Sequence, residues 1–265
     1  MILDEIVACK RRELKRAREE RPAAELRTMA RSAAPLRDFT AAIRREGEVA
    51  IVAEIKRASP ARGVLRENLD PAELAGKYAE GGARAISVLT DREFFHGSAE
   101  DLRAARTAGL PVLRKDFVID EYQLWEARVM LADAAILIAR ILDSNQLAEY
   151  VALAKEELKL AVLVEVHAEK ELERALDAGA PIVGINNRDL ATFRVSMETT
   201  ARLRPLVPAG VPVVSESGIA AAKDMELLRH LKVDAALVGE ELVTSPDPAA
   251  KLRELYGGAR NPRGR

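Results

Sequence analysis

The chain has 265 residues, of which 48% are apolar, with 41 Lys and Arg against 42 Asp and Glu. This near-neutral balance gives no broad basic field, so we expect neither nucleic acid nor a membrane as a partner. A single cysteine, Cys9, excludes an intramolecular disulfide, and no apolar run approaches the roughly 20 residues of a membrane span. We therefore expect a soluble, cytoplasmic protein of one domain.

The first 48 residues precede the first predicted strand and show helical patterns over 2–20, 23–30 and 35–45. Residues 1–21 lack the apolar core and small-residue cleavage site of a secretory signal, so no export is expected. The segment is too long for a linker and is densely charged. We interpret residues 1–48 as an N-terminal helical extension that lies outside the following domain and covers part of it.

Eight short apolar runs alternate with helical patterns through the rest of the chain. Each run is rich in Val, Ile, Leu and Ala and ends at polar or glycine-containing residues, which is typical of buried parallel strands. The predicted strands are 49–55, 84–89, 111–115, 133–139, 161–166, 181–185, 211–215 and 234–238. The predicted helices are 71–80, 99–108, 121–131, 144–158, 168–178, 197–206, 220–231 and 248–256.

This alternation predicts an α/β fold, a (β/α)8 TIM barrel over residues 49–256, since a strand and a helix together use roughly 20–35 residues. Glycines stand just before several strands, where a left-handed residue ends a helix. An open doubly wound sheet is the alternative, but no G-x-G-x-x-G follows the first strand. Residues 257–265 have too few apolar side chains to offset the entropy of ordering, and we expect a disordered tail.

Charged residues stand at the carboxyl ends of the predicted strands, where a barrel has its active site. The two-residue period of a strand places Glu54 and Lys56 on one inward face, and it directs Lys115 and Glu165 inward from the third and fifth strands. Valines on both sides of Glu165 predict a base with a raised pKa. The alternative for each residue is a strand-end ion pair or a solvated charge.

Short turns at the same end predict a phosphate site. Ser217 and Gly218 follow the seventh strand, and Gly239 and Glu240 follow the eighth. These are the positions where barrels bind phosphate through backbone N–H groups. Ser59 adds a hydroxyl after the first strand. Plain turns are the alternative, but a small phosphorylated molecule is the expected ligand.

Other polar residues are expected to have supporting roles. We predict that Glu216 orients a neighbour, and that Arg114 and Asp116 face outward from the third strand as partners in salt bridges. The three histidines are His96, His167 and His230. They lack the close spacing of metal ligands, so no metal site is expected.

Beyond these patterns, the sequence resembles the indole-3-glycerol-phosphate synthases of tryptophan biosynthesis over about residues 36–255. Eight segments carry the resemblance in order and spacing: AEIKRASPARG (53–63), SVLTDREFFHGS (87–98), LRKDFVIDEYQ (113–123), ILIARIL (136–142), LVEVH (163–167), GINNRDL (184–190), SESGI (215–219) and LVGEELV (237–243). The resemblance implies conversion of 1-(2-carboxyphenylamino)-1-deoxyribulose 5-phosphate into indole-3-glycerol phosphate, with loss of carbon dioxide and water. It implies no redox cofactor and no metal.

The resemblance also implies residue roles. Lys115 resembles the general acid of ring closure, Glu165 the acid–base partner in dehydration, and Glu54 and Lys56 a supporting pair. The remaining matches are to substrate-binding residues: Asn186 and Arg188 for hydroxyl and carboxylate groups; Ser217, Gly218, Gly239 and Glu240, with Ser59 nearby, for phosphate; Phe94, Phe117 and Leu190 for the apolar wall beside the aromatic ring.

One segment departs from the family pattern. Ser-Pro-Ala-Arg-Gly stands at residues 59–63 where Ser-Pro-Ser-Lys-Gly is common, and we expect Arg62 to change the motion of this loop. A barrel like phosphoribosylanthranilate isomerase is the alternative enzyme, although that chemistry uses a cysteine and Cys9 precedes the predicted barrel. A catalytically silent scaffold that docks other tryptophan-pathway enzymes is a third hypothesis. We expect a monomer, with contact to such enzymes as a further expectation.

Overall fold

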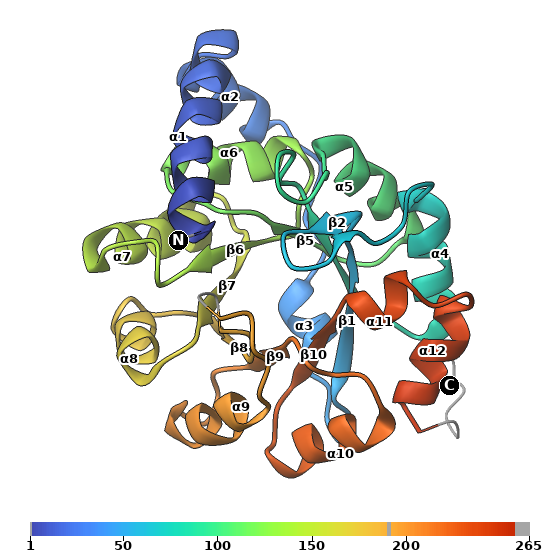
Figure 1. Cartoon of the computed structure of the whole chain (residues 1–265). Helices are drawn as coiled ribbons and strands as arrows, with labels where there is room; N and C mark the ends of the chain where they lie inside the picture. The colour runs from blue at the N-terminus through green and yellow to red at the C-terminus, as the bar shows by residue number, and fades with distance from the viewer. Residues whose placement is uncertain (1, 190–191, 258–265) are drawn as a thin grey trace.

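The computed structural model describes residues 2–189 and 192–257. Eight parallel strands form a closed barrel in the order β1-β10-β9-β8-β7-β6-β5-β4 (Figure 1). They are β1 (Ala50–Ile55), β4 (Ala85–Leu89), β5 (Val112–Lys115), β6 (Ala134–Ile138), β7 (Ala161–Val166), β8 (Ile182–Asn186), β9 (Val213–Glu216) and β10 (Ala235–Val238). All eight coincide with predicted strands apart from their end residues, so the predicted barrel is confirmed.

Helices follow the strands and cover the outside of the barrel (Figure 1). They are α4 (Pro71–Gly81), α5 (Ala99–Ala105), α6 (Glu121–Val129), α7 (Ser144–Ala152), α8 (Glu169–Asp177), α9 (Glu198–Leu203), α10 (Ala222–His230), α11 (Glu240–Val243) and α12 (Pro248–Leu255). The predicted helix 144–158 changes after α7 into a π-helical stretch, η2 (Leu153–Glu157). The short helix α11 and a hairpin of β2 (Ala58–Ser59) and β3 (Gly63–Val64) were not predicted.

Helix α4, the first of the helices that alternate with the strands, shows how the local sequence sets where a helix begins and ends. The Asp70 carboxylate accepts hydrogen bonds from the backbone N–H groups of Ala72 and Glu73, which have no partner within the helix. Pro71 follows at the first helical position, where its missing N–H costs nothing. Gly82 ends the helix with a φ of 98°, a left-handed conformation that penalises a Cβ atom.

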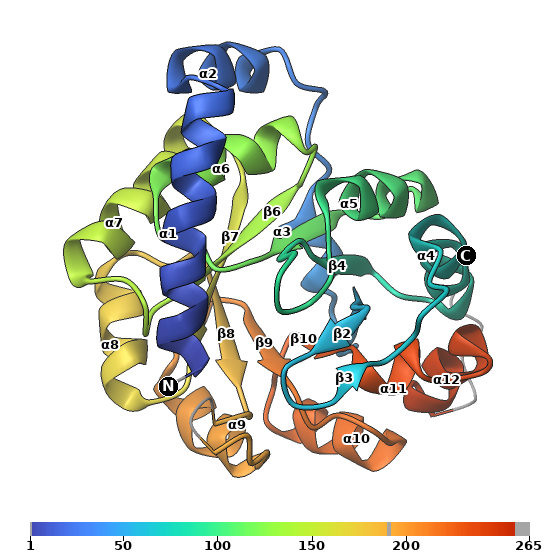
Figure 2. The ribbon, with the colours of Figure 1, turned by 45° about the horizontal axis from the view of Figure 1, so that its top comes forward.

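The N-terminal extension divides into two parts. Helices α1 (Ile2–Glu20) and α2 (Ala23–Arg31) lie outside the barrel beside α6 (Figure 2). Tyr122 on α6 donates its hydroxyl to the carbonyl oxygens of Ala17 and Arg21, which fixes the junction between α1 and α2. In the described part of the chain, no helix has an apolar stretch of the length that a bilayer crossing requires.

The third helix, α3 (Phe39–Ile43), is the part of the extension that covers one end of the barrel. Phe39 and Ile43 are 1% and 0% exposed and pack on inward-facing strand residues such as Ala50 and Val52. They therefore close the amino end of the barrel. Which end of the barrel the extension covers was not predicted, because the charge of the long extension conceals two large apolar side chains within one short helix.

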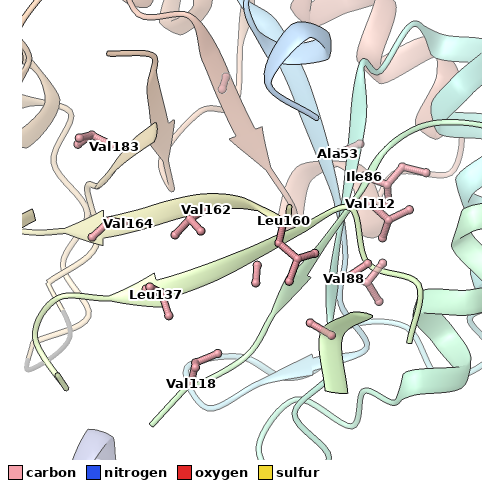
Figure 3. Packing of buried hydrophobic residues seen from close by; sticks show 14 of the residues in the cluster. Ala53, Ile86, Val88, Val112, Val118, Leu137, Leu160, Val162, Val164 and Val183 are labelled. Carbon is pink, nitrogen blue, oxygen red and sulfur yellow. The ribbon is translucent and has the colours of Figure 1, made fainter. Parts of the chain in front are cut away.

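Strand residues that point outward form the larger core, between barrel and helices. Ile86, Val112, Val162 and Val164 belong to it, and each is fully buried (Figure 3). Because both faces of every strand are covered, the strands are continuous apolar runs rather than alternating ones. A charged residue within such a strand therefore lies at its carboxyl end, where the cavity opens.

Candidate active site

Three charged side chains from three strands meet at the carboxyl end of the barrel. The Lys115 ammonium at the end of β5 lies 2.9 Å from Glu165 Oε2 on β7 and 3.1 Å from Glu216 Oε2 at the end of β9. Glu165 and Glu216 are almost completely buried, at 2% and 1% exposure. The two-residue strand period predicted the inward direction of Lys115 and Glu165, and the structure confirms it.

A second ion pair lies at the end of β1. Lys56 Nζ is 2.9 Å from Glu54 Oε1, as the shared strand face predicted, and Glu54 is 4% exposed. A Cβ atom on Gly239 would lie 2.4 Å from Glu54 Oε1. The structure therefore gives Gly239 a steric reason for being glycine that the phosphate prediction did not include.

Burial and charge shift the pKa values of the central cluster in different directions. Burial would lower the pKa of Lys115, but Glu165 and Glu216, with Glu54 further away, raise it above its ordinary value. Burial would raise the pKa of Glu165, but Lys115, with a smaller contribution from His167, lowers it below its ordinary value. The predicted raised pKa of Glu165 is therefore wrong, because its flanking valines were visible in the sequence and the ammonium was not.

Glu216 has the raised pKa instead. Burial of its carboxylate, together with repulsion from Glu165, raises the pKa of Glu216 to about 7, although Lys115 acts in the opposite direction. Its Oε1 atom is buried and has no hydrogen-bond partner among the described residues. Glu216 contacts Lys115, as its predicted orienting role requires, but it can also gain or lose a proton near neutral pH.

A histidine lies behind Glu165. His167 Nε2 is 3.4 Å from Glu165 Oε1, and Nδ1 is 3.2 Å from Glu171 Oε2 at the start of α8. Glu171 also accepts a hydrogen bond from the backbone N–H of His167 and is paired with Arg140 at 2.7 Å. His167 thus contacts a candidate catalytic group, Glu165, from outside the cavity.

The two ion-pair clusters line a cavity of about 320 Å³, with Glu54, Lys56, Lys115, Glu165 and Glu216 in its wall. Of the predicted substrate-binding residues, seven line it: Asn186, Arg188, Ser217, Gly218, Gly239, Glu240 and Phe117. Ser59 does not line it, and its hydroxyl accepts a hydrogen bond from the backbone N–H of Arg62. Leu190 lies outside the described residues.

The apolar wall contains Phe95 where the sequence analysis placed Phe94. The ring centroids of Phe95 and Phe117 are 6.0 Å apart, and both residues line the cavity. The two adjacent phenylalanines were equivalent in the sequence, because a loop has no periodicity that tells which side chain faces inward. Leu89 and Ile138 add apolar surface near them.

The turn after β9 is held from beneath by Asn187, which the sequence analysis did not single out. Its Nδ2 donates to Ser217 O and to Ser215 Oγ, both at 3.0 Å. Ser217 and Gly218 both have positive φ, 68° and 84°, so the turn depends on this support and on glycine at its second position. The signal in the sequence was an asparagine that directly follows a buried strand.

The loop after β1 reaches across the cavity. Arg62, which stands where the family commonly has lysine, lies 2.7 Å from Glu240 at the start of α11, and both residues line the cavity. The β2–β3 hairpin and the turn after β10 are thereby connected. This contact ties the predicted phosphate region to the segment that departs from the family pattern.

A closed parallel barrel with acidic and basic side chains converging at the carboxyl ends of its strands is the arrangement of a (β/α)8-barrel enzyme. The model of the family described as "Indole-3-glycerol phosphate synthase" matches residues 3–255. The chain belongs to the indole-3-glycerol phosphate synthase family, as the resemblance predicted.

Two relatives of that name agree with the family match. One from Roseiflexus sp. (strain RS-1) is 50% identical over 267 residues, covering 97% of this chain and 99% of the relative. One from Bordetella pertussis is 48% identical over 258 residues, covering 96% and 98%. The identities extend over nearly the whole chain, including the N-terminal extension.

Solved structures with much lower identity show the fold alone. Thiamine phosphate pyrophosphorylase from Pyrococcus furiosus has a TM-score of 0.59 at 18% identity, over 82% of this chain and 97% of that one. 3-Hexulose-6-phosphate synthase from Salmonella typhimurium has a TM-score of 0.62 at 13% identity, over 78% and 96%.

Proposed function

We propose that the Lys115 cluster at the barrel mouth converts 1-(2-carboxyphenylamino)-1-deoxyribulose 5-phosphate into indole-3-glycerol phosphate. By family the chain is an indole-3-glycerol phosphate synthase, a carboxy-lyase. The observation that supports the residue assignment is the position of Lys115, within 3.1 Å of two buried carboxylates in a cavity with an aromatic wall. Both an acid and a base are thus present beside one reacting centre.

Ring closure requires an acid at the substrate ketone. The anthranilate carbon that bears the carboxylate attacks the ketone, and the Lys115 ammonium donates a proton to the alkoxide that forms. The raised pKa of Lys115 keeps this group protonated at neutral pH. The resulting Lys115 amine then takes up a proton from a neighbouring group, and Glu216, with a pKa of about 7, is suited to supply it.

Decarboxylation and dehydration follow. Loss of carbon dioxide leaves its electron pair in the ring and restores the aromatic benzene. Lys56 or Lys115 then protonates the departing hydroxyl while Glu165 removes a proton from the adjacent ring carbon. The lowered pKa of Glu165 favours the ionised form that a base must have. Since the substrate carboxylate leaves as neutral carbon dioxide, each turnover takes up one proton.

Substrate binding is assigned to the rest of the cavity. Ser217 and Gly218 face the phosphate together with the turn after β10, and Asn186 and Arg188 face the hydroxyl and carboxylate groups. Phe117 contacts the aromatic ring. A monomeric state, a cytoplasmic location and contact with other enzymes of tryptophan biosynthesis are parts of the same proposal.

Indole fluorescence gives a direct test, because only the product contains an indole. We expect wild-type turnover of the carboxyphenylamino substrate, and a rate lowered by about 10²–10⁴-fold in Lys115→Ala and in Glu165→Gln. Lys159→Ala, which changes a lysine far from the mouth, is the matched control. Near-wild-type turnover in either active-site variant removes that residue from the mechanism, and no turnover by the wild type contradicts the proposed function.

A further inference from the structure

A buried ammonium lies outside the cavity, on the N-terminal helix. Lys10 of α1 is 4% exposed, and its Nζ lies 2.7 Å from Asp91 Oδ2 and 3.0 Å from Asp116 Oδ1. Glu13, one turn along α1, is 2.8 Å from the same nitrogen. Burial would lower the pKa of Lys10, but Asp116 and Asp91 hold it above its ordinary value, so the group is a cation.

Asp91 organises the loop after β4. Its Oδ1 accepts hydrogen bonds from the backbone N–H groups of Phe94 at 2.7 Å and Phe95 at 3.2 Å. Its carbonyl oxygen accepts another from Gly97 at 2.7 Å. Asp91 is completely buried, and its Oδ2 has no hydrogen-bond donor among the described residues other than the Lys10 ammonium beside it.

Asp116 organises the loop after β5 in the same way. Its Oδ1 accepts a hydrogen bond from the backbone N–H of Phe117 at 2.8 Å, and its Oδ2 accepts one from Thr90 Oγ1 at 2.6 Å. Arg114, on the outward side of β5, lies 3.0 Å from Oδ2. The prediction that Arg114 and Asp116 take part in salt bridges is therefore confirmed, and the structure shows that they pair with each other, buried beneath α1.

The two loops carry the two rings of the aromatic wall. Phe95 belongs to the turn that Asp91 holds, and Phe117 directly follows Asp116; their ring centroids are 6.0 Å apart. We propose that Lys10 is a positioning residue, which joins the two aspartates and thereby sets the spacing of Phe95 and Phe117 around the substrate's aromatic ring. This inference rests on the proposed function for the identity of that ring.

The physical reason is repulsion. Without the ammonium, the buried carboxylates of Asp91 and Asp116 lose the cation that they share, while Arg114 remains paired with Asp116, and separation of the two aspartates relieves their repulsion. Each carboxylate moves with the backbone N–H groups that it holds, so the two phenylalanines separate as well. The phosphate end of the cavity, formed by the turns after β9 and β10, has no contact with Lys10 and keeps its geometry.

Calorimetric titration of Lys10→Met with two ligands tests the proposal. Indole-3-glycerol phosphate has an aromatic ring and a phosphate, whereas glycerol 3-phosphate has the phosphate alone. We expect Lys10→Met to bind the indole ligand about tenfold more weakly while the affinity for glycerol 3-phosphate stays unchanged. Equal losses for both ligands, or no loss for either, would overturn the proposed role of Lys10.

Two control variants separate positioning from general damage. Glu13→Gln removes a Lys10 partner that is not part of either loop, and Lys15→Met removes an exposed lysine of the same helix; both are expected to bind both ligands as the wild type does. If Lys10→Met does not fold, Lys10→Gln decides, because its amide can still donate to the two aspartates while the compensating charge is lost. It should show the same selective loss, and equal losses for both ligands or unchanged affinity for both would count against the proposal.

Hydrogen exchange provides a readout that does not depend on the reaction. Faster exchange at residues 94–97 and 117–119 in Lys10→Met, with unchanged exchange at 217–220, is expected. The same change in exchange rate at all of these residues, or no change at any of them, would contradict the proposal. Failure of the wild type to turn over substrate would instead contradict the proposed function, so the two outcomes are distinguishable.

Discussion

Gly184 on β8 leaves the space that the Glu216 carboxylate of the adjacent strand occupies. A Cβ atom at position 184 would lie 2.4 Å from Glu216 Oε1 and 2.4 Å from Leu163 Cδ2. Gly184→Ala should therefore displace Glu216 from Lys115, lower kcat, and destabilise the fold by about 1–3 kcal/mol through overpacking. Steady-state kinetics and urea unfolding measure the two effects.

Gly76→Ala is the control for that substitution. Gly76 is inside α4, and among the described residues a Cβ atom there would meet nothing within 4 Å apart from its chain neighbours and the adjacent helix backbone, so alanine should leave kcat unchanged and stabilise the protein by up to about 1 kcal/mol. A Gly184→Ala enzyme with wild-type kcat and stability would show that the neighbouring side chains move without cost.

The pKa of Glu216 predicts a dependence of stability on pH. Because the pKa rises from 4.5 to about 7 on folding, the folded protein retains a proton that the unfolded chain releases between these values. The resulting stabilisation is complete below pH 4.5 and is lost as the pH rises through 7. Glu216→Gln cannot ionise, so it should match the wild type in acid and exceed its stability by up to about 3 kcal/mol above pH 8.

Thermal and urea unfolding of both proteins between pH 5 and pH 9 would measure this difference. Glu226→Gln, which changes an exposed carboxylate of α10, is expected to follow the wild type throughout. If Glu216→Gln and the wild type lose stability in parallel as the pH rises, the carboxylate does not retain its proton in the folded state.

Arg62→Ala should release the loop after β1. The guanidinium is largely exposed, so its contact with Glu240 contributes at most about 1 kcal/mol to stability. We expect an unchanged unfolding temperature, faster hydrogen exchange at residues 58–64, and a higher KM. Arg62→Lys keeps the positive charge but replaces the planar guanidinium with a flexible ammonium, and it should give an intermediate KM. Unaltered exchange in the alanine variant would mean that the hairpin is held without Arg62.

Phe39→Ala tests whether α3 is part of the barrel core. The side chain is 1% exposed among inward-facing strand residues, so its loss should cost about 3–5 kcal/mol. Met29 of α2 is 37% exposed, so Met29→Ala should lower the free energy of unfolding by well under 1 kcal/mol. Denaturant unfolding compares the two, and similar small losses would place α3 outside the cooperative unit.

The barrel was predictable because strand period, helix caps and their repetition are local properties. Each buried strand is an apolar run, and Asp70 and Gly82 bound α4 through contacts within a few residues. The plug formed by α3 was not predictable, because the burial of Phe39 depends on strands that come later in the chain. The π-helical η2 and the hairpin at residues 58–64 likewise had no recognised local signal.

The candidate site was predicted in part. The strand period directed Glu54, Lys115 and Glu165 inward, and the structure brings them to one cavity. The choice between Phe94 and Phe95 failed because loop conformation is not periodic. The raised pKa was assigned to Glu165 rather than Glu216, since a pKa depends on which charges face the group across the barrel.

The sequence by itself determined the order of the elements, the inward face of each strand and the family of the enzyme, because these depend on residue type and spacing along the chain. Only the tertiary structure decided which carboxylate takes up a proton near neutral pH and which charge anchors α1 to the barrel. Lys115 and Glu216 are 101 positions apart, and Lys10 lies on a helix that precedes every strand. Electrostatic energy depends on distance through space, and closure of the barrel sets those distances.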